Sequence, residues 1–162
     1  MKNIDEIGLK LCKIQAGIFE KSVTELECSS AIFVRRFMLS SVAKRMDDGS
    51  FLFESCSINE VFSEIENEFG KSNYGTEKIS SEELYWIGYL YRYWCYTYQK
   101  TSKQLYKIIK MKELRTLYYP YHSLDPAQAI ERILEAKGES ETEEDLIRKG
   151  VEILRRKRTK ES

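Results

Sequence analysis

Hydrophobic residues recur at helical spacing along most of the chain. Near the N-terminus, apolar residues follow one another at steps of three and four, at Ile4, Ile7, Leu11, Ile14 and Ile18. Such spacing places them along one side of a helix, which we expect from about Asn3 to Lys21. Similar stripes predict further helices at about Ser29–Met46, Ile58–Phe69, Ser81–Gln99, just after Thr101, and at Lys112–Tyr118, Asp125–Gly138 and Thr142–Arg158.

Polar residues that favour helix starts precede several of these stretches. A Ser or Thr followed three residues later by Glu or Gln can satisfy two backbone N–H groups reciprocally. The pattern occurs at Ser57 and Glu60, Ser80 and Glu83, Thr101 and Gln104, and Ser140 and Glu143, and Asp125 with Pro126 makes a variant. Together with the periodicity, these patterns predict an all-α fold, a compact bundle of seven or eight helices.

Three features are expected to divide the helices. The turn "DDGS" at 47–50 should end the second helix. "FLFES" at 51–55 is the one plausible strand, with a buried extended link as the alternative. Pro120 should end the sixth helix, because proline lacks an N–H and clashes with the preceding turn. Gly138 and the polar residues after it separate the last helix. We therefore expect a helical domain at 1–138 and a C-terminal amphipathic helix with a basic tail at 139–162.

The stretch at Ser81–Gln99 is rich in Tyr and Trp and is apolar on nearly all sides. It is predicted to be the central helix, packed by neighbours on several faces, with a close helix crossing at Gly88. Arg92 interrupts it. Because an unpaired buried charge is very costly, Arg92 is interpreted either as half of a structural ion pair or as a group that binds an anion or a partner.

The composition limits the choice of partners. Lys and Arg number 26, as do Asp and Glu, so the net charge of zero gives no general argument for binding nucleic acid or an acidic membrane surface. No signal peptide and no uncharged stretch of about 18 residues is evident, so we expect a cytoplasmic protein that does not enter a membrane.

The four cysteines form no CxxC pair and are expected to be buried free thiols. With a single histidine, no metal site is expected, and no cofactor motif is present.

Arg115 precedes the only histidine, His122, with six residues between them. This spacing is similar to the motif of the HEPN ribonucleases, an all-helical and commonly dimeric family. The resemblance implies metal-independent RNA cleavage, with His122 moving a proton at the 2′-OH and Arg115 stabilising the phosphate charge. In that family the two residues usually occupy one helix end, whereas Pro120 interrupts this segment. The alternative is a loop histidine held by local hydrogen bonds.

A helix-turn-helix is a further alternative for residues 101–117. The segment has a local excess of basic residues, at Lys103, Lys107, Lys110, Lys112 and Arg115. Its turn lacks the glycine often found in this motif, and lysines on exposed helices are usually only solvated. Nucleic-acid binding is therefore left open.

Three blocks, "SSAIFVRRFMLSSVAKRMDDGSFLFES", "SEELYWIGYLYRYWCYTYQKTSKQLYKIIK" and "LYYPYHSLDPAQAIERILEAKG", give the chain a further likeness. They resemble a family of small bacterial helical proteins associated with toxin–antitoxin-like gene neighbourhoods. The resemblance covers roughly Ser29 to Gly138 and brings no catalytic motif. It implies a cytosolic protein that neutralises a toxin.

A protein-binding role also agrees with two amphipathic stripes near the termini. Helix-in-groove recognition uses such stripes, although either stripe could equally complete the protein's own core. The expected partner is another protein, a cognate toxin in particular, and a homodimer is the alternative. The candidate contact residues are Ile7, Leu11, Ile14, Ile147, Val151 and Leu154.

Overall fold

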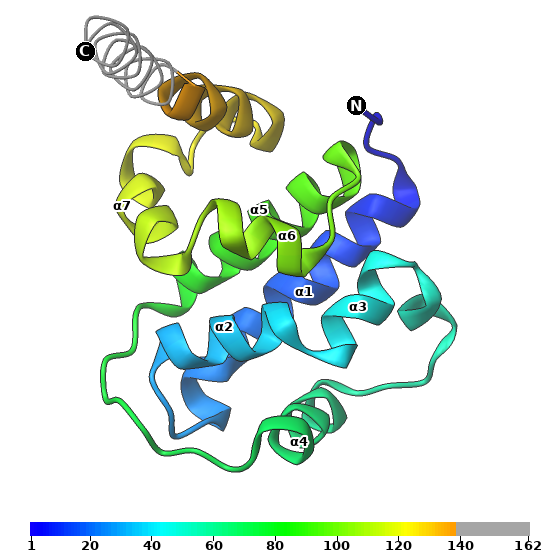
Figure 1. Ribbon diagram of the computed structural model, residues 1–162, viewed down its shortest axis with the longest axis vertical. Coiled ribbons are helices and arrows are strands. Elements are labelled where there is room, and N and C mark those ends of the chain that lie inside the picture. Colours follow the sequence, from blue (N-terminus) through cyan, green and yellow to red (C-terminus); the bar gives the residue numbers. More distant parts are fainter. Residues whose placement is uncertain (139–162) are drawn as a thin grey trace, which may run out of the picture. The chain divides into compact units, whose positions relative to one another are not determined.

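The computed structural model describes residues 1–138, which are helical for most of their length (Figure 1). The elements are α1 (Glu6–Glu25), α2 (Ser30–Leu39), α3 (Ser41–Asp47), the 3₁₀ helix η1 (Ser50–Phe53), α4 (Ile58–Phe69), α5 (Ser81–Tyr98), α6 (Ser102–Ile108) and α7 (Met111–Tyr121). A further helix covers residues 126–138. No strand occurs within this range, and the all-α prediction is confirmed. The helix expected at Thr142–Arg158 lies outside the described residues.

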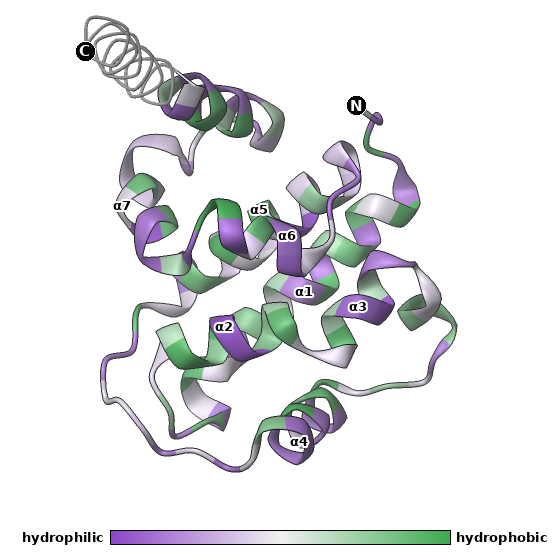
Figure 2. Ribbon diagram, viewed as in Figure 1, coloured by the Kyte–Doolittle hydropathy of each residue, from purple (hydrophilic) through white to green (hydrophobic). Residues whose placement is uncertain are grey.

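The chain divides into two compact units, Met1–Pro126 and Ala127–Ser162. The division falls earlier than the boundary expected after Gly138. All of α1 to α7 belongs to the first unit, whereas the described part of the second unit, residues 127–138, is one stretch of helix. Figure 2 shows hydrophobic and hydrophilic residues alternating along the helices, as expected for amphipathic helices.

The core of the first unit is built on the pairing of α1 with α5. Ile87 and Trp94 of α5 are buried, as are Leu11 and Phe19 of α1. A Cβ at Gly88 would lie 2.8 Å from Cγ of Phe19, and the Gln15 amide donates to the Gly88 carbonyl at 3.0 Å. The predicted close crossing at Gly88 is therefore confirmed, and it depends on the missing side chain there.

Two of the predicted capping boxes are complete. The hydroxyl of Ser57 accepts from the Glu60 N–H, while the Glu60 carboxylate accepts from the Ser57 N–H. Thr101 and Gln104 do the same at α6. Ser80 caps α5 by accepting from the Glu83 N–H, and the structure assigns no complete box there. The box expected at Ser140 lies outside the described residues.

The single helix predicted at Ser29–Met46 is wrong, because Ser40 divides it into α2 and α3. Ser40 has extended backbone angles, φ −81° and ψ 163°. Its hydroxyl donates to the Phe37 carbonyl at 2.7 Å and accepts from the Ala43 N–H at 3.2 Å. One side chain thus satisfies backbone groups of both helices, which makes a sharp break favourable.

The strand predicted at 51–55 is also wrong. Gly49 has the left-handed φ of 81°, which a glycine adopts without strain, and it leads directly into η1. Backbone bonds from Leu52 to Gly49 and from Glu54 to Phe51 close the 3₁₀ turns. Phe51 is buried by this geometry, and Phe53 is left 93% exposed.

Pro120 does not end α7, contrary to the prediction. The helix continues to Tyr121, and His122 still donates its N–H to the Tyr118 carbonyl at 2.8 Å. Because Pro120 is the next-to-last residue of α7, its missing N–H removes only one hydrogen bond at an exposed helix end.

Candidate functional site

Arg92 lies in the middle of a buried polar network that joins four helices. Its side chain is 1% exposed, and it forms an ion pair with Asp47 of α3 at 2.6 Å. The guanidinium also donates to the Gln15 amide oxygen of α1 and to the Ser102 hydroxyl of α6, both at 2.8 Å. Asp47 in turn accepts from the backbone N–H and the hydroxyl of Ser102, at 3.0 and 2.7 Å. These contacts link α1, α3 and α6 to α5 through the side chain of Arg92.

Two cysteines near this network have thiols whose pKa is raised by burial. Burial raises the pKa of the Cys12 thiol to about 12 and that of the Cys95 thiol to about 11, although the Arg92 charge acts in the opposite direction. Both thiols are therefore protonated and behave as small apolar groups. Cys28 is also buried, Cys56 is half-buried, and all four thiols are free. Within residues 1–138, no group of three His, Cys, Asp or Glu side chains is placed to hold a metal ion.

Arg115 and His122 lie seven residues apart at the exposed side of α7. The Arg115 guanidinium contacts the Glu77 carboxylate at 2.6 Å and the Glu83 carboxylate at 3.4 Å. The His122 ring stacks on Tyr118 with centroids 4.3 Å apart, and its Nδ1 lies 2.8 Å from the Tyr118 carbonyl oxygen. Two helical turns, about 11 Å of rise, separate the two positions. Each side chain is thus engaged by its own neighbours, and no hydrogen bond or ion pair joins the two.

The residues proposed for a helix-turn-helix form α6 and α7, which only Ile109 and Lys110 separate. The connection is fixed to the core, because the Tyr91 hydroxyl donates to the Ile109 carbonyl at 2.7 Å. The lysines at 103, 107, 110 and 112 are exposed.

The three candidate contact residues on α1 have different environments. Leu11 is 1% exposed and belongs to the protein's own core, whereas Ile7 is 56% exposed. Ile14 is half-buried and lies two helical turns beyond Ile7 on the same side of α1. The other three candidates, Ile147, Val151 and Leu154, lie outside the described residues.

Ile14 lines an open groove of about 380 Å³, which we call the α1 groove. One wall is the outer side of α1, and the other is the segment that runs from η1 to the start of α4. A Cβ atom at Gly17 would have no other atom within 4 Å. The groove is therefore open above this position on α1. The lining consists of Lys10, Lys13, Ile14, Gly17, Phe51, Leu52, Glu54, Cys56, Ser57 and Ile58.

The charges around the α1 groove are unequal. Glu54 is already paired with Arg45 at 2.8 Å. Lys10 and Lys13 are exposed and make no ion pair within residues 1–138. Phe53, which is 93% exposed, directly follows Leu52 of the groove wall. The groove therefore combines apolar lining, a neighbouring exposed aromatic ring and two exposed lysines on its α1 side.

The hydrophobic pattern of the N-terminal helix indicated Ile14, but no sequence pattern indicated the opposite wall of the groove. "FLFES" was interpreted as a strand, and that pattern would have placed Phe51 and Phe53 on the same face. The 3₁₀ geometry instead buries one ring and exposes the other. The glycine of the preceding "DDGS" turn was the available signal for a tight turn at this point.

Comparison of this chain with protein-family models, with curated proteins and with solved structures gave no match. No helix within residues 1–138 is long and apolar enough to span a bilayer.

Proposed function

We propose that the protein acts by binding another protein in the bacterial cytoplasm, as the antitoxin-like neutralising member of a toxin–antitoxin or defence pair. The observation that carries the proposal is the α1 groove with its exposed neighbour Phe53. Aromatic anchors and apolar pockets dominate the energetics of protein interfaces. That the partner is a toxin is inferred from the sequence of residues 29–138, through its resemblance to proteins of toxin–antitoxin-like loci.

The occupant that fits the α1 groove best is an amphipathic helix of the partner, with acidic residues beside its apolar ones. An apolar side chain can enter over Gly17 and contact Ile14, Leu52 and Ile58. Carboxylates on either side of it would meet Lys10 and Lys13, which have no acidic partner of their own within residues 1–138. Such charge complementarity accelerates encounter and selects the partner. Ile7 extends the same contact along α1.

Gly17 offers a selective way to test the groove. Because its Cβ position is open, Gly17→Leu can be accommodated in the folded protein while filling the groove. Gly17→Ala is the matched control, since it adds only a methyl group and should stabilise α1 by about 0.5–1 kcal/mol. The protein is co-expressed with the product of the neighbouring gene, and co-purification and rescue of growth are measured.

We expect the wild type and Gly17→Ala to capture the neighbouring product and to rescue growth, and Gly17→Leu to do neither. Phe53→Ser should weaken capture, whereas Tyr119→Ser, at an exposed ring on α7, should not. If Gly17→Leu retains full capture, the partner does not use the α1 groove. If the wild type captures no neighbouring product and rescues no cell, the antitoxin proposal is wrong. Conversion of a dimer to a monomer by Gly17→Leu would identify a second copy of the chain as the occupant.

The stripe near the C-terminus is tested separately. Val151→Asp and Leu154→Asp should leave the protein folded and abolish capture if Ile147, Val151 and Leu154 contact the partner. Unfolding of these variants, measured by circular dichroism, would instead place the stripe in the protein's own core.

A further inference from the structure

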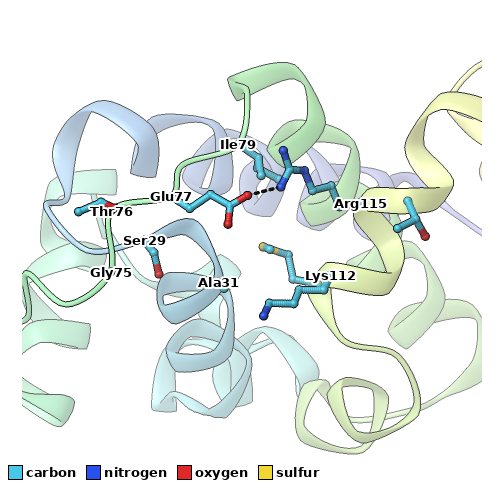
Figure 3. Close-up of a pocket in the computed structure, with 10 residues that line it drawn as sticks. Ser29, Ala31, Gly75, Thr76, Glu77, Ile79, Lys112 and Arg115 are labelled. Carbon is cyan, nitrogen blue, oxygen red and sulfur yellow. Dashed lines mark hydrogen bonds and ion pairs between the residues drawn. The ribbon is translucent and has the colours of Figure 1, made fainter.

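An open cleft of about 750 Å³ lies between the start of α2, the segment leading into α5, and α7 (Figure 3). Its volume falls within the range of about 300–1,000 Å³ that is usual for small-molecule sites. None of its lining residues belongs to the α1 groove. The cleft is thus a second feature of the same unit, independent of the proposed protein-binding function.

The wall formed by residues 74–79 is fixed to α2 by hydrogen bonds. The Ser29 N–H donates to the Tyr74 carbonyl and the Ser30 N–H to the Glu77 carbonyl, each at 3.1 Å. The Ile79 N–H donates to the Ser30 hydroxyl at 3.1 Å. Gly75 has a φ of 76°, and a Cβ there would lie 2.8 Å from Ser29 Oγ, so only glycine suits this position. The cleft therefore has a preformed wall.

The opposite wall places two cations one helical turn apart. Lys112 and Arg115 of α7 both line the cleft, and in Figure 3 the Lys112 side chain extends from α7 toward α2. Lys112 makes no ion pair within residues 1–138. The apolar residues Ala31, Ile79 and Met111 lie in the same lining, and Ile79 and Met111 are nearly fully buried. The cleft thus offers positive charge beside an apolar surface.

The ion pair between Arg115 and Glu77 spans the cleft and is exposed to solvent. The two side chains are 42% and 72% exposed, and Figure 3 shows them pointing toward each other. Exposed ion pairs contribute at most about 1 kcal/mol. A ligand oxyanion can therefore replace Glu77 on the Arg115 guanidinium at small cost, and the planar fork of arginine matches phosphate and carboxylate oxygens well.

We propose that this cleft binds a small organic anion, an oxyanion group on an apolar body, through Lys112 and Arg115, with Glu77 as the nearer of two internal competitors for Arg115. The oxyanion is a phosphate monoester or a carboxylate. Its apolar body lies against Ala31, Ile79 and Met111.

Isothermal titration calorimetry with four probes tests the proposal: phenyl phosphate, benzoate, inorganic phosphate and benzyl alcohol. We expect phenyl phosphate or benzoate to bind, the tighter of the two assigning the oxyanion, and benzyl alcohol not to bind. Lys112→Gln and Arg115→Gln should each weaken binding about tenfold, as expected for lost charge-assisted hydrogen bonds. Glu77→Gln should strengthen binding several-fold, because it removes the nearer of the two carboxylates, Glu77 and Glu83, that pair with Arg115. Lys103→Gln, at an exposed lysine outside the cleft, is the control and should change nothing.

The sign of the Glu77→Gln effect is the sharpest readout. Weaker binding of phenyl phosphate or benzoate in this variant would mean that Glu77 holds the Arg115 guanidinium in its binding position, and it would overturn the role of Glu77 as a competitor. Unchanged affinity in Lys112→Gln and Arg115→Gln, or no binding of any anion at millimolar concentration, would refute the site. Equal affinity for inorganic phosphate and phenyl phosphate would show that the apolar body of the ligand does not contribute to binding. Backbone amide shifts in the wild type, expected at residues 75–79 and 111–116, give a readout that needs no variant.

Discussion

Arg92 and Arg115 form two ion pairs with the same N–O distance, 2.6 Å, in opposite surroundings. Arg92 and Asp47 have side chains 1% and 12% exposed, whereas Arg115 and Glu77 are 42% and 72% exposed. Removal of one member of a buried pair leaves the other charge without solvent or partner. Removal of one member of an exposed pair returns the other to water. The N–O distance alone therefore does not distinguish a structural ion pair from an exchangeable one. The exposed fraction of the two side chains makes that distinction.

The largest expected effect is on Arg92. Arg92→Ala should lower the free energy of unfolding by about 3–5 kcal/mol, because Asp47 loses its counter-charge in a mostly buried position. Arg115→Ala is the matched control and should cost at most about 1 kcal/mol. Chemical denaturation followed by circular dichroism measures both. Similar midpoints for Arg92→Ala and the wild type would remove the structural role of Arg92 and favour a partner-binding one.

Double-mutant cycles give the next largest effect. The coupling free energy between Arg92 and Asp47, from alanine variants at both positions, should be about 2–3 kcal/mol. Between Arg115 and Glu77 it should be about 0.2–1 kcal/mol. A strong coupling at the exposed pair would contradict the proposal that Glu77 can be displaced from Arg115 by a ligand.

The smallest effect is the response to salt. Raising the ionic strength to 1 M shortens the screening length to about 3 Å. The coupling between Arg115 and Glu77 should then disappear, while that between Arg92 and Asp47 should remain. The same two cycles repeated in 1 M NaCl provide the measurement. Loss of the Arg92 coupling in salt would show that the buried pair is open to ions.

Local signals predicted the elements whose ends depend on adjacent residues. The pair Ser57 and Glu60 caps the start of α4. The helix ends at Phe69, just before Gly70, and both ends agree with the sequence prediction. Ser40 was not found, because a serine within an apolar stripe is compatible with a continuous helix. Its role as a break depends on hydrogen bonds to both α2 and α3.

The candidate sites were less predictable because they join distant segments. Arg92 was recognised as anomalous, but its partners Gln15 and Asp47 are 77 and 45 residues away. Lys112 was recorded only as part of a basic cluster. Its place in a cleft depends on residues 75–79 lying against α2, which periodicity cannot indicate. Ile7 and Leu11 looked equivalent in the N-terminal stripe, yet only Leu11 is buried in the fold.

The pairing of α1 with α5 has a consequence for how the chain folds during synthesis. The contact between Gln15 and Gly88 joins residues 73 positions apart. At a translation rate of about 5–20 residues per second, α5 follows α1 by about 4–15 s. Throughout that interval Leu11 and Phe19 have no α5 to pack against, and long-range contacts of this kind also slow folding. The side of α1 that packs against Gly88 therefore stays uncovered throughout that interval.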